Sequence, residues 1–139
     1  MGNNRTALTP ILLLWLVISG ALIWFGWDNI VSLGGFDPDD KLRMVQLRDF
    51  LAGQSWFDTT QYRMNPPEGA PMHWSRLIEL PLAFLIVILT PIFGGHVATM
   101  IAGSVVPLLL LLWISYMLAQ IATRIASREA GVVAAMITL

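Results

Sequence analysis

The chain has 139 residues, of which 56% are hydrophobic and only 12% are charged, and its net charge is −1. A soluble globular chain carries about twice this share of charged residues. The composition therefore excludes a disordered chain, a basic nucleic-acid-binding module and an ordinary soluble enzyme. The mean hydropathy of +0.69 indicates a membrane protein. The sequence contains no cysteine, so it offers neither a disulfide framework nor a thiolate site.

Residues 6–27 form the first uncharged stretch, between Arg5 and Asp28. A helix of this length reaches roughly 33 Å, enough to cross the ~30 Å hydrocarbon core of a bilayer. We therefore predict a first transmembrane helix over residues 7–27. The alternative is a cleaved signal peptide with a small-residue cleavage site at residues 19–21, but the apolar run continues beyond that point.

Residues 80–123 form a second stretch, with no formal charge when its histidine is neutral. Because 44 residues are too many for one crossing, we divide the stretch at Gly94-Gly95. The first piece, residues 80–93, has a length typical of an interfacial or re-entrant helix. The second piece is long enough to span with some tilt, so we predict a second transmembrane helix over residues 96–123.

The positive-inside tendency sets the predicted orientation. If only the second piece crosses, Arg5 lies on the same side of the membrane as Arg124 and Arg128. We therefore place the N-terminus in the cytoplasm and residues 28–95 in an extracytoplasmic loop. Residues 130–139 are apolar but too few to span. We expect them to begin a further helix, so that residues 1–139 form a single N-terminal membrane segment of a longer protein.

The predicted loop begins with the signature of a helix start, Asp-Pro-Asp-Asp at residues 37–40. An acid suits the N-cap, proline suits the first helical position, and further acids suit the positive end of the helix dipole. Apolar residues then follow at helical spacing: Met44, Leu47 and Leu51. Gly53 suits the C-terminal stop. We predict an amphipathic helix over residues 38–52, lying on the membrane surface.

A turn is predicted at residues 65–69, which read Asn-Pro-Pro-Glu-Gly. The predicted fold class is thus all-α. It comprises polytopic transmembrane helices and an extracytoplasmic loop that carries amphipathic surface helices, including the interfacial piece at residues 80–93.

The three carboxylates of Asp37, Asp39 and Asp40 form the sharpest candidate site. Hard divalent cations such as Mg²⁺ or Mn²⁺ bind oxygen ligands of this kind, so a metal site is one interpretation. A general base for an acceptor hydroxyl is the second. Ordinary capping of a helix by acids in its first turn is the third. The spacing alone leaves all three open.

Arg43, Arg63 and Arg76 are candidate phosphate ligands, because a guanidinium group matches phosphate with two hydrogen bonds. For each arginine the alternative is a solvated charge or a pair with one of the loop's acids. His73 is a candidate base or ligand, although a lone histidine is more often neither. We predict three rings as interfacial anchors, with a sugar-stacking platform as the alternative: Trp56, Phe57 and Trp74.

The layout of one span, an acid-led external loop and further spans resembles the GT-C class of integral-membrane glycosyltransferases. Residues 36–45, Phe-Asp-Pro-Asp-Asp-Lys-Leu-Arg-Met-Val, are similar to the first-loop motif of oligosaccharyltransferase catalytic subunits. Residues 124–135 resemble that family's cytoplasmic turn into the next helix. Asp39-Asp40 stand where those enzymes carry aromatic residues, and a paired acid is more typical of mannosyl- and aminoarabinosyl-transferase relatives. Residues 56–76 look like those of a bacterial GT-C-like subfamily.

The resemblance implies a multi-pass enzyme of the bacterial inner membrane. It would transfer a sugar from a polyprenyl-phosphate-linked donor to an acceptor at the periplasmic face, with inversion at the anomeric carbon. The acids at residues 37–40 would deprotonate the acceptor or hold Mg²⁺ or Mn²⁺. Fixed cations would neutralise the departing phosphate. The expected partners are the lipid-linked donor and membrane lipids, with no nucleic acid.

Because GT-C enzymes build the donor groove from many more spans, the resemblance also implies that this segment alone is inactive. A non-enzymatic polytopic component, such as a transporter part or an assembly factor, is the alternative function. A transporter places ionisable groups inside its spans. The predicted spans hold none apart from a histidine at one edge, which favours the enzyme.

Overall fold

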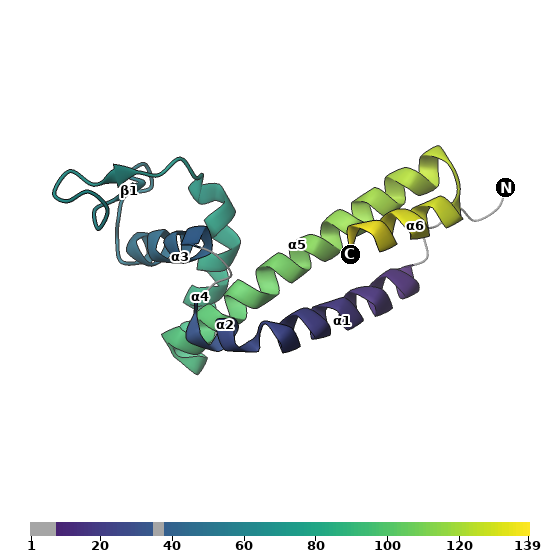
Figure 1. Ribbon diagram of the computed structural model, residues 1–139, viewed down its shortest axis with the longest axis horizontal. Coiled ribbons are helices and arrows are strands. Elements are labelled where there is room, and N and C mark those ends of the chain that lie inside the picture. The colour runs from purple at the N-terminus through teal and green to yellow at the C-terminus, as the bar shows by residue number, and fades with distance from the viewer. Residues whose placement is uncertain (1–7, 35–37) are drawn as a thin grey trace. The chain divides into compact units, whose positions relative to one another are not determined.

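The computed structural model describes residues 8–34 and 38–139, and most of them are helical (Figure 1). The α-helices are α1 (Leu8–Phe25), α2 (Trp27–Ser32), α3 (Pro38–Leu51), α4 (Leu80–Phe93), α5 (Gly95–Ile125) and α6 (Arg128–Thr138). A 3₁₀ turn, η1 (Arg76–Glu79), precedes α4, and the strands are β1 (Thr60–Gln61) and β2 (Ala70–Pro71). The chain divides into two compact units, Met1–Trp27 with Ser104–Leu139, and Asp28–Gly103.

Within residues 8–34 and 38–139, three stretches are long and apolar enough to cross a membrane: Leu8–Phe25, Arg76–Phe93 and Gly95–Ile125. The predicted all-α class is thereby confirmed, together with helices of membrane-spanning length and composition. The first and third stretches coincide with the two spans predicted from the uncharged runs. Few of their residues are buried within the protein, as expected for helices that present apolar side chains to lipid.

The middle stretch, Arg76–Phe93, is longer than the 14-residue piece predicted from the sequence. The helix begins four residues earlier, because η1 runs directly into α4. Ser75 caps this turn, and its Oγ accepts a hydrogen bond from the backbone N–H of Leu77 at 3.2 Å. With 18 residues, the stretch matches a crossing as well as a re-entrant helix. The number of crossings therefore stays a prediction.

In the first unit, α1, the later part of α5, and α6 share a small core. Ile11, Ala119 and Ala135 come from the three helices in turn and are buried together. Trp15 Nε1 donates a hydrogen bond to the carbonyl of Leu108 at 2.8 Å, which attaches α1 to α5. The start of α6 is capped by Ser127, whose Oγ accepts from the N–H of Ala130 at 3.2 Å.

In the second unit, α3 packs through Leu47 against small residues of its neighbours. Leu47 is buried in one cluster with Ala83 and Ile86 of α4 and Ala102 of α5. Met44 packs against the same cluster. The predicted helix is therefore present, and of its apolar residues Leu47 is buried against protein, Met44 is half-buried and Leu51 is exposed. The alanines explain this arrangement, because small side chains let helices approach closely.

The ends of α3 follow the sequence signals. The helix starts at Pro38 as predicted, whereas its predicted cap, Asp37, lies outside the described residues. Gly53 has a φ of +108°, and its N–H donates to the carbonyl of Phe50 at 3.0 Å. The next N–H, that of Gln54, reaches Asp49 at 3.0 Å. This pair of bonds is a Schellman motif, and the predicted stop at Gly53 is confirmed.

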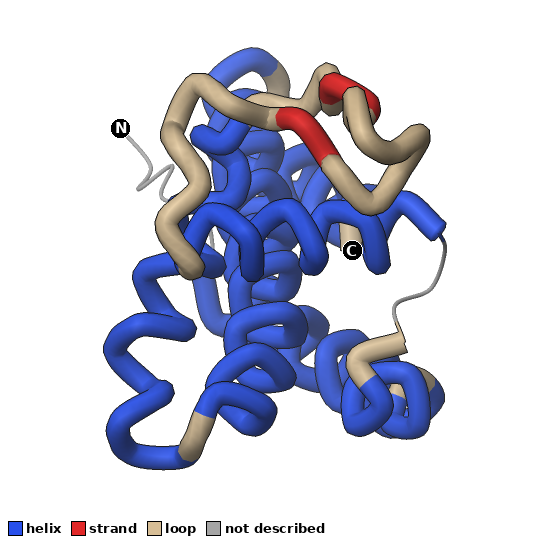
Figure 2. The backbone as a smooth tube through the Cα atoms, turned by 90° about the vertical axis from the view of Figure 1, so that its left-hand side faces the viewer, coloured by secondary structure: helices blue, strands red, loops and turns tan. Residues whose placement is uncertain are grey.

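The strands β1 and β2 pair in antiparallel register, with Thr60 opposite Pro71 and Gln61 opposite Ala70. Between them, the N–H of Gly69 donates to the carbonyl of Asn65 at 2.9 Å, which confirms the predicted turn. The side chains at the tip of this hairpin, residues 65–68, are exposed. Figure 2 shows the loops and strands of this region lying beside α3.

Candidate functional site

The first turn of α3 carries two of the three predicted acids. Asp39 is exposed and Asp40 is half-buried. The third acid, Asp37, lies outside the described residues. Within residues 8–34 and 38–139, no group of three His, Cys, Asp or Glu side chains is placed to hold a metal ion. The oxygens of Asp39 and Asp40 remain ligands of the type that Mg²⁺ and Mn²⁺ prefer.

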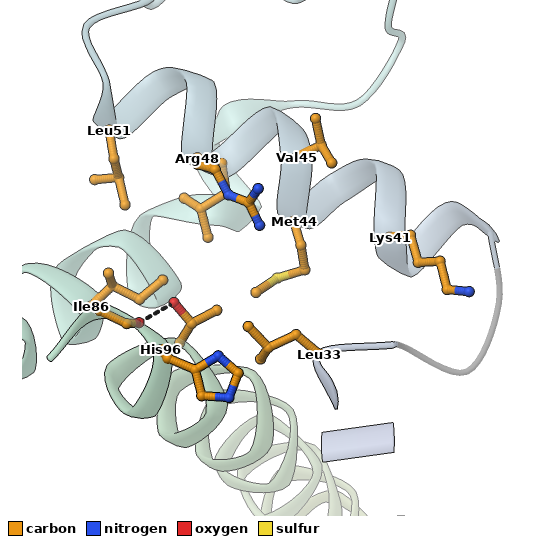
Figure 3. A pocket seen from close by; sticks show the side chains of 11 residues that line it. Leu33, Lys41, Met44, Val45, Arg48, Leu51, Ile86 and His96 are labelled. Carbon is orange, nitrogen blue, oxygen red and sulfur yellow. Dashed lines mark hydrogen bonds between the residues drawn. The ribbon is translucent and has the colours of Figure 1, made fainter. Parts of the chain in front are cut away.

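A pocket of about 430 Å³ lies along the face of α3 that carries Lys41 and Arg48 (Figure 3). It is lined by Leu33, Lys41, Met44, Val45, Leu47, Arg48, Leu51, Ile86, Gly95, His96 and Thr99. All of these residues belong to the second unit. The lining joins a largely apolar wall to a small number of charged and polar groups, which is the usual composition of a ligand site.

Two cations of α3 stand on the pocket wall. Lys41 and Arg48 are seven residues apart, so two helical turns bring them to the same face, and both side chains are exposed. Figure 3 shows Met44 between them, together with Leu33 and Ile86 from other segments. An anion bound by these cations would have an apolar surface directly beside it.

His96 forms the polar end of the pocket, at the start of α5. Its Nε2 lies 3.0 Å from the carbonyl oxygen of Val31. When Nε2 carries the proton and donates to this oxygen, Nδ1 is an acceptor. Thr99 also lines the pocket, and its Oγ1 donates to the carbonyl of Gly95 at 2.7 Å (dashed line in Figure 3). In the tautomer with the proton on Nε2, the Val31 carbonyl oxygen therefore orients the His96 ring.

The sequence-based site prediction missed Lys41, Arg48 and His96. A signal for the two cations was present, because residues 41 and 48 share a face of the predicted helix at a spacing of seven. For His96 the sequence offered only its place beside the Gly94-Gly95 break. Its contact with the chain 65 residues earlier has no local signal.

Arg76, a predicted phosphate ligand, has a different environment in the structure. Its side chain is buried, and its Nε donates to the carbonyl of Trp56 at 3.1 Å. Nη2 donates to Gln54 Oε1 at 3.0 Å and to the carbonyl of Asp58. Nη1 lies 3.6 Å from Glu79 Oε2. The guanidinium group thus holds residues 54–58 against η1, and we leave Arg76 out of the proposed phosphate site.

Arg63, the second predicted phosphate ligand, pairs with Asp49 of α3. Its guanidinium forms two hydrogen bonds with the carboxylate of Asp49, and Nη1 also donates to Gln61 Oε1 at 3.0 Å. This contact holds the pKa of Asp49 below its ordinary value and raises the pKa of Arg63 above its ordinary value. Of the three interpretations offered by the sequence, namely a phosphate ligand, a solvated charge or a pair with an acid, the pair is the one observed.

Arg43, His73 and Trp74 are brought together, from α3 and the loop before η1. The Arg43 guanidinium lies 4.9 Å from the centroid of the Trp74 ring, a cation–π contact. The His73 ring lies 5.1 Å from that of Trp74. Arg43 follows Asp39 by four residues and so shares its helix face. These residues form the part of the predicted site that the structure gathers in one place.

The two remaining predicted anchor rings differ in environment. Trp56 packs edge-to-face against Phe50, with ring centroids 5.8 Å apart. Phe57 is 92% exposed. Phe57 therefore has the exposure that an interfacial anchor needs, and Trp56, which is 40% exposed, also contacts Phe50 of α3.

Comparison with known proteins adds no family to these observations. No family model matches the chain, and searches among curated proteins and solved structures find no match. Its function must therefore be inferred from its own residues. The informative features are the apolar helices, the acidic first turn of α3, and the pocket with two cations beside that turn.

Proposed function

We propose that this chain belongs to a GT-C-like glycosyltransferase of the bacterial inner membrane. The enzyme would transfer a sugar from a polyprenyl-phosphate-linked donor to an acceptor at the periplasmic face. The observation that carries the proposal is the pocket beside α3. Its apolar lining suits an isoprenoid chain, and Lys41 and Arg48 suit the phosphate. A polyprenyl phosphate combines both chemistries in one molecule.

The acids of α3 supply the chemistry at the other reacting group. One carboxylate, of Asp39 or Asp40, accepts the proton of the acceptor hydroxyl as its oxygen attacks the anomeric carbon. The bond between that carbon and the phosphate oxygen breaks, and its electron pair leaves with the phosphate. Lys41 and Arg48 stabilise the charge that develops there. A divalent cation held by the acids would supply further positive charge.

A photoreactive polyprenyl phosphate tests the pocket in membranes that contain the protein. We expect crosslinks on α3, and we expect the double variant Lys41→Gln/Arg48→Gln to lower the crosslinked yield several-fold. Arg128→Gln is the matched control, because it removes an exposed cation from α6 in the other unit. Equal yields from the double variant and the control would overturn the binding assignment.

A transfer assay with labelled lipid-linked sugar tests the reaction in the full-length protein, with and without divalent metal. Asp39→Asn and Asp40→Asn are expected to abolish product while membrane insertion is unchanged. Asp28→Asn is the control, since it removes an exposed acid of α2. Unchanged product in both variants, and in Asp37→Asn, would remove the catalytic assignment. Lipid binding without transfer would instead favour the non-enzymatic component.

A further inference from the structure

Gln46 is a buried polar residue of α3 that the proposed reaction does not use. The residue is 1% exposed, and its side-chain Nε2 and Oε1 have no hydrogen-bond partner among the described residues. An amide that is buried without partners forfeits its hydrogen bonds to water, which lowers the stability of the fold. Protein interiors therefore rarely keep such a group unsatisfied.

Polar groups that complement the Gln46 amide lie in η1, the turn before α4. Arg76 and Glu79 are each 3% exposed. Arg76 Nη1 and both carboxylate oxygens of Glu79 are buried without a hydrogen-bond partner in the described part of the chain. Nη1 and Oε2 are 3.6 Å apart, which is longer than a hydrogen bond. The turn thus offers one unused donor and two unused acceptors.

Helical spacing directs Gln46 toward this turn. Residues three and four positions apart share a helix face, and Gln46 stands between Arg43 and Phe50 on α3. Arg43 contacts the ring of Trp74, and the Arg76 guanidinium lies 5.0 Å from the centroid of the Phe50 ring. Arg43 and Phe50, which flank Gln46 on one face of α3, therefore both contact the segment that runs from Trp74 into η1.

We propose that an internal water molecule binds between α3 and η1 and joins the Gln46 amide to Arg76 and Glu79. Such a water accepts from Arg76 Nη1 and Gln46 Nε2 and donates to Glu79 and to Gln46 Oε1. Buried waters typically make about three bonds of this kind. This water site would attach α3, through Arg76, to residues 54–58. It does not depend on the function proposed for the pocket, because none of its three residues lines that pocket.

The sign of a stability change distinguishes a hydrated amide from a bare one. Gln46→Met keeps the length of the side chain and removes both polar atoms. If the amide is bare, the substitution relieves an unsatisfied group and the Tm rises. If the water is bound, Arg76 and Glu79 lose a shared partner, and we expect the Tm in detergent to fall by several degrees. Leu42→Met is the control, since it introduces the same side chain at a half-buried position of α3 that does not line the pocket, and we expect it to change the Tm little.

Nuclear magnetic resonance detects the water in the unmodified chain, so the test does not depend on the variant folding. We expect the side-chain NH₂ of Gln46 to show cross-relaxation with a water molecule of long residence time. A rise in Tm for Gln46→Met would overturn the proposal, and so would a Gln46 NH₂ group without a water cross-peak.

Discussion

Arg63 of the loop and Asp49 of α3 form a two-point ion pair, with Nη1 2.6 Å from Oδ2 and Nη2 3.0 Å from Oδ1. Gln61, in β1, adds a bond from its Nε2 to the same Oδ2 at 3.1 Å. The hairpin is therefore attached to α3 through one carboxylate. Because these bonds hold the pKa of Asp49 below its ordinary value, the attachment depends on pH.

We expect acidification to loosen the hairpin. The folded state binds the Asp49 proton less tightly than the unfolded state does. The stabilisation is therefore complete above the ordinary aspartate pKa of about 3.9 and is lost as the pH falls through the lower folded pKa. Protection from hydrogen exchange should fall over this range for the hydrogen-bonded N–H groups of the hairpin, such as those of Met64 and Gly69. Asp49→Asn should show low protection at every pH. Glu68→Gln, at the exposed hairpin tip, is the control, and a pH profile of Asp49→Asn like that of the unmodified chain would contradict the assignment.

Gly131→Ala is expected to weaken the packing of α6 against α5. A Cβ at this position would stand 2.8 Å from the carbonyl oxygen of Ala119 and would collide with the side chain of Thr123. Because a backbone atom cannot move aside, the helices must separate, at a cost of about 1–3 kcal/mol. Thermal unfolding in detergent measures the loss. Gly20→Ala is the control, since a Cβ there meets nothing within 4 Å. A Gly131→Ala protein as stable as this control would argue against close contact.

Trp15→Phe removes the indole N–H that donates to the carbonyl of Leu108. Hydrogen bonds between membrane helices contribute about 0.6 kcal/mol on average, so we expect a small loss of stability in denaturation by sodium dodecyl sulfate. Trp24→Phe is the control, because that side chain belongs to the same helix and is 79% exposed. Equal effects of the two substitutions would show that the bond to Leu108 contributes nothing.

Cysteine labelling decides the number of crossings, and the absence of native cysteines makes each introduced thiol the only one in the chain. With two crossings, an impermeant reagent should label Glu68→Cys from the periplasm and Arg128→Cys from the cytoplasm. If Arg76–Phe93 also crosses, both positions label from the periplasm. Labelling of Glu68→Cys only from the cytoplasm would refute the predicted orientation and with it the periplasmic reaction.

The helices could be predicted from the sequence because their signals are local. Uncharged runs located the apolar helices, and α4 has the predicted bounds of residues 80–93. Pro38 and Gly53 marked the start and stop of α3 because their effect on the backbone is nearly independent of context. The extension of α4 by η1 was missed, since residues 76–79 include two charges and interrupt the apolar pattern.

The roles of the polar side chains could not be predicted, because they depend on contacts between distant residues. Arg76 bonds to groups 18 to 22 residues earlier in the chain, and Arg63 pairs with an acid 14 residues earlier. No periodicity in the sequence announces such pairs. Gln46 was overlooked for a related reason, since a glutamine on an amphipathic helix is ordinarily solvated. Its burial accompanies long-range contacts of two other residues on α3, those of Arg43 with Trp74 and of Phe50 with Arg76.

The turn between β1 and β2 closes on itself through the bond from Gly69 to Asn65, and its tip at residues 65–68 is exposed. Exposed tips of this kind tolerate added sequence, because no buried backbone is disturbed. A small rigid module grafted there would act as a fiducial marker. The marker would give the membrane-embedded helices an external landmark for alignment in electron cryomicroscopy.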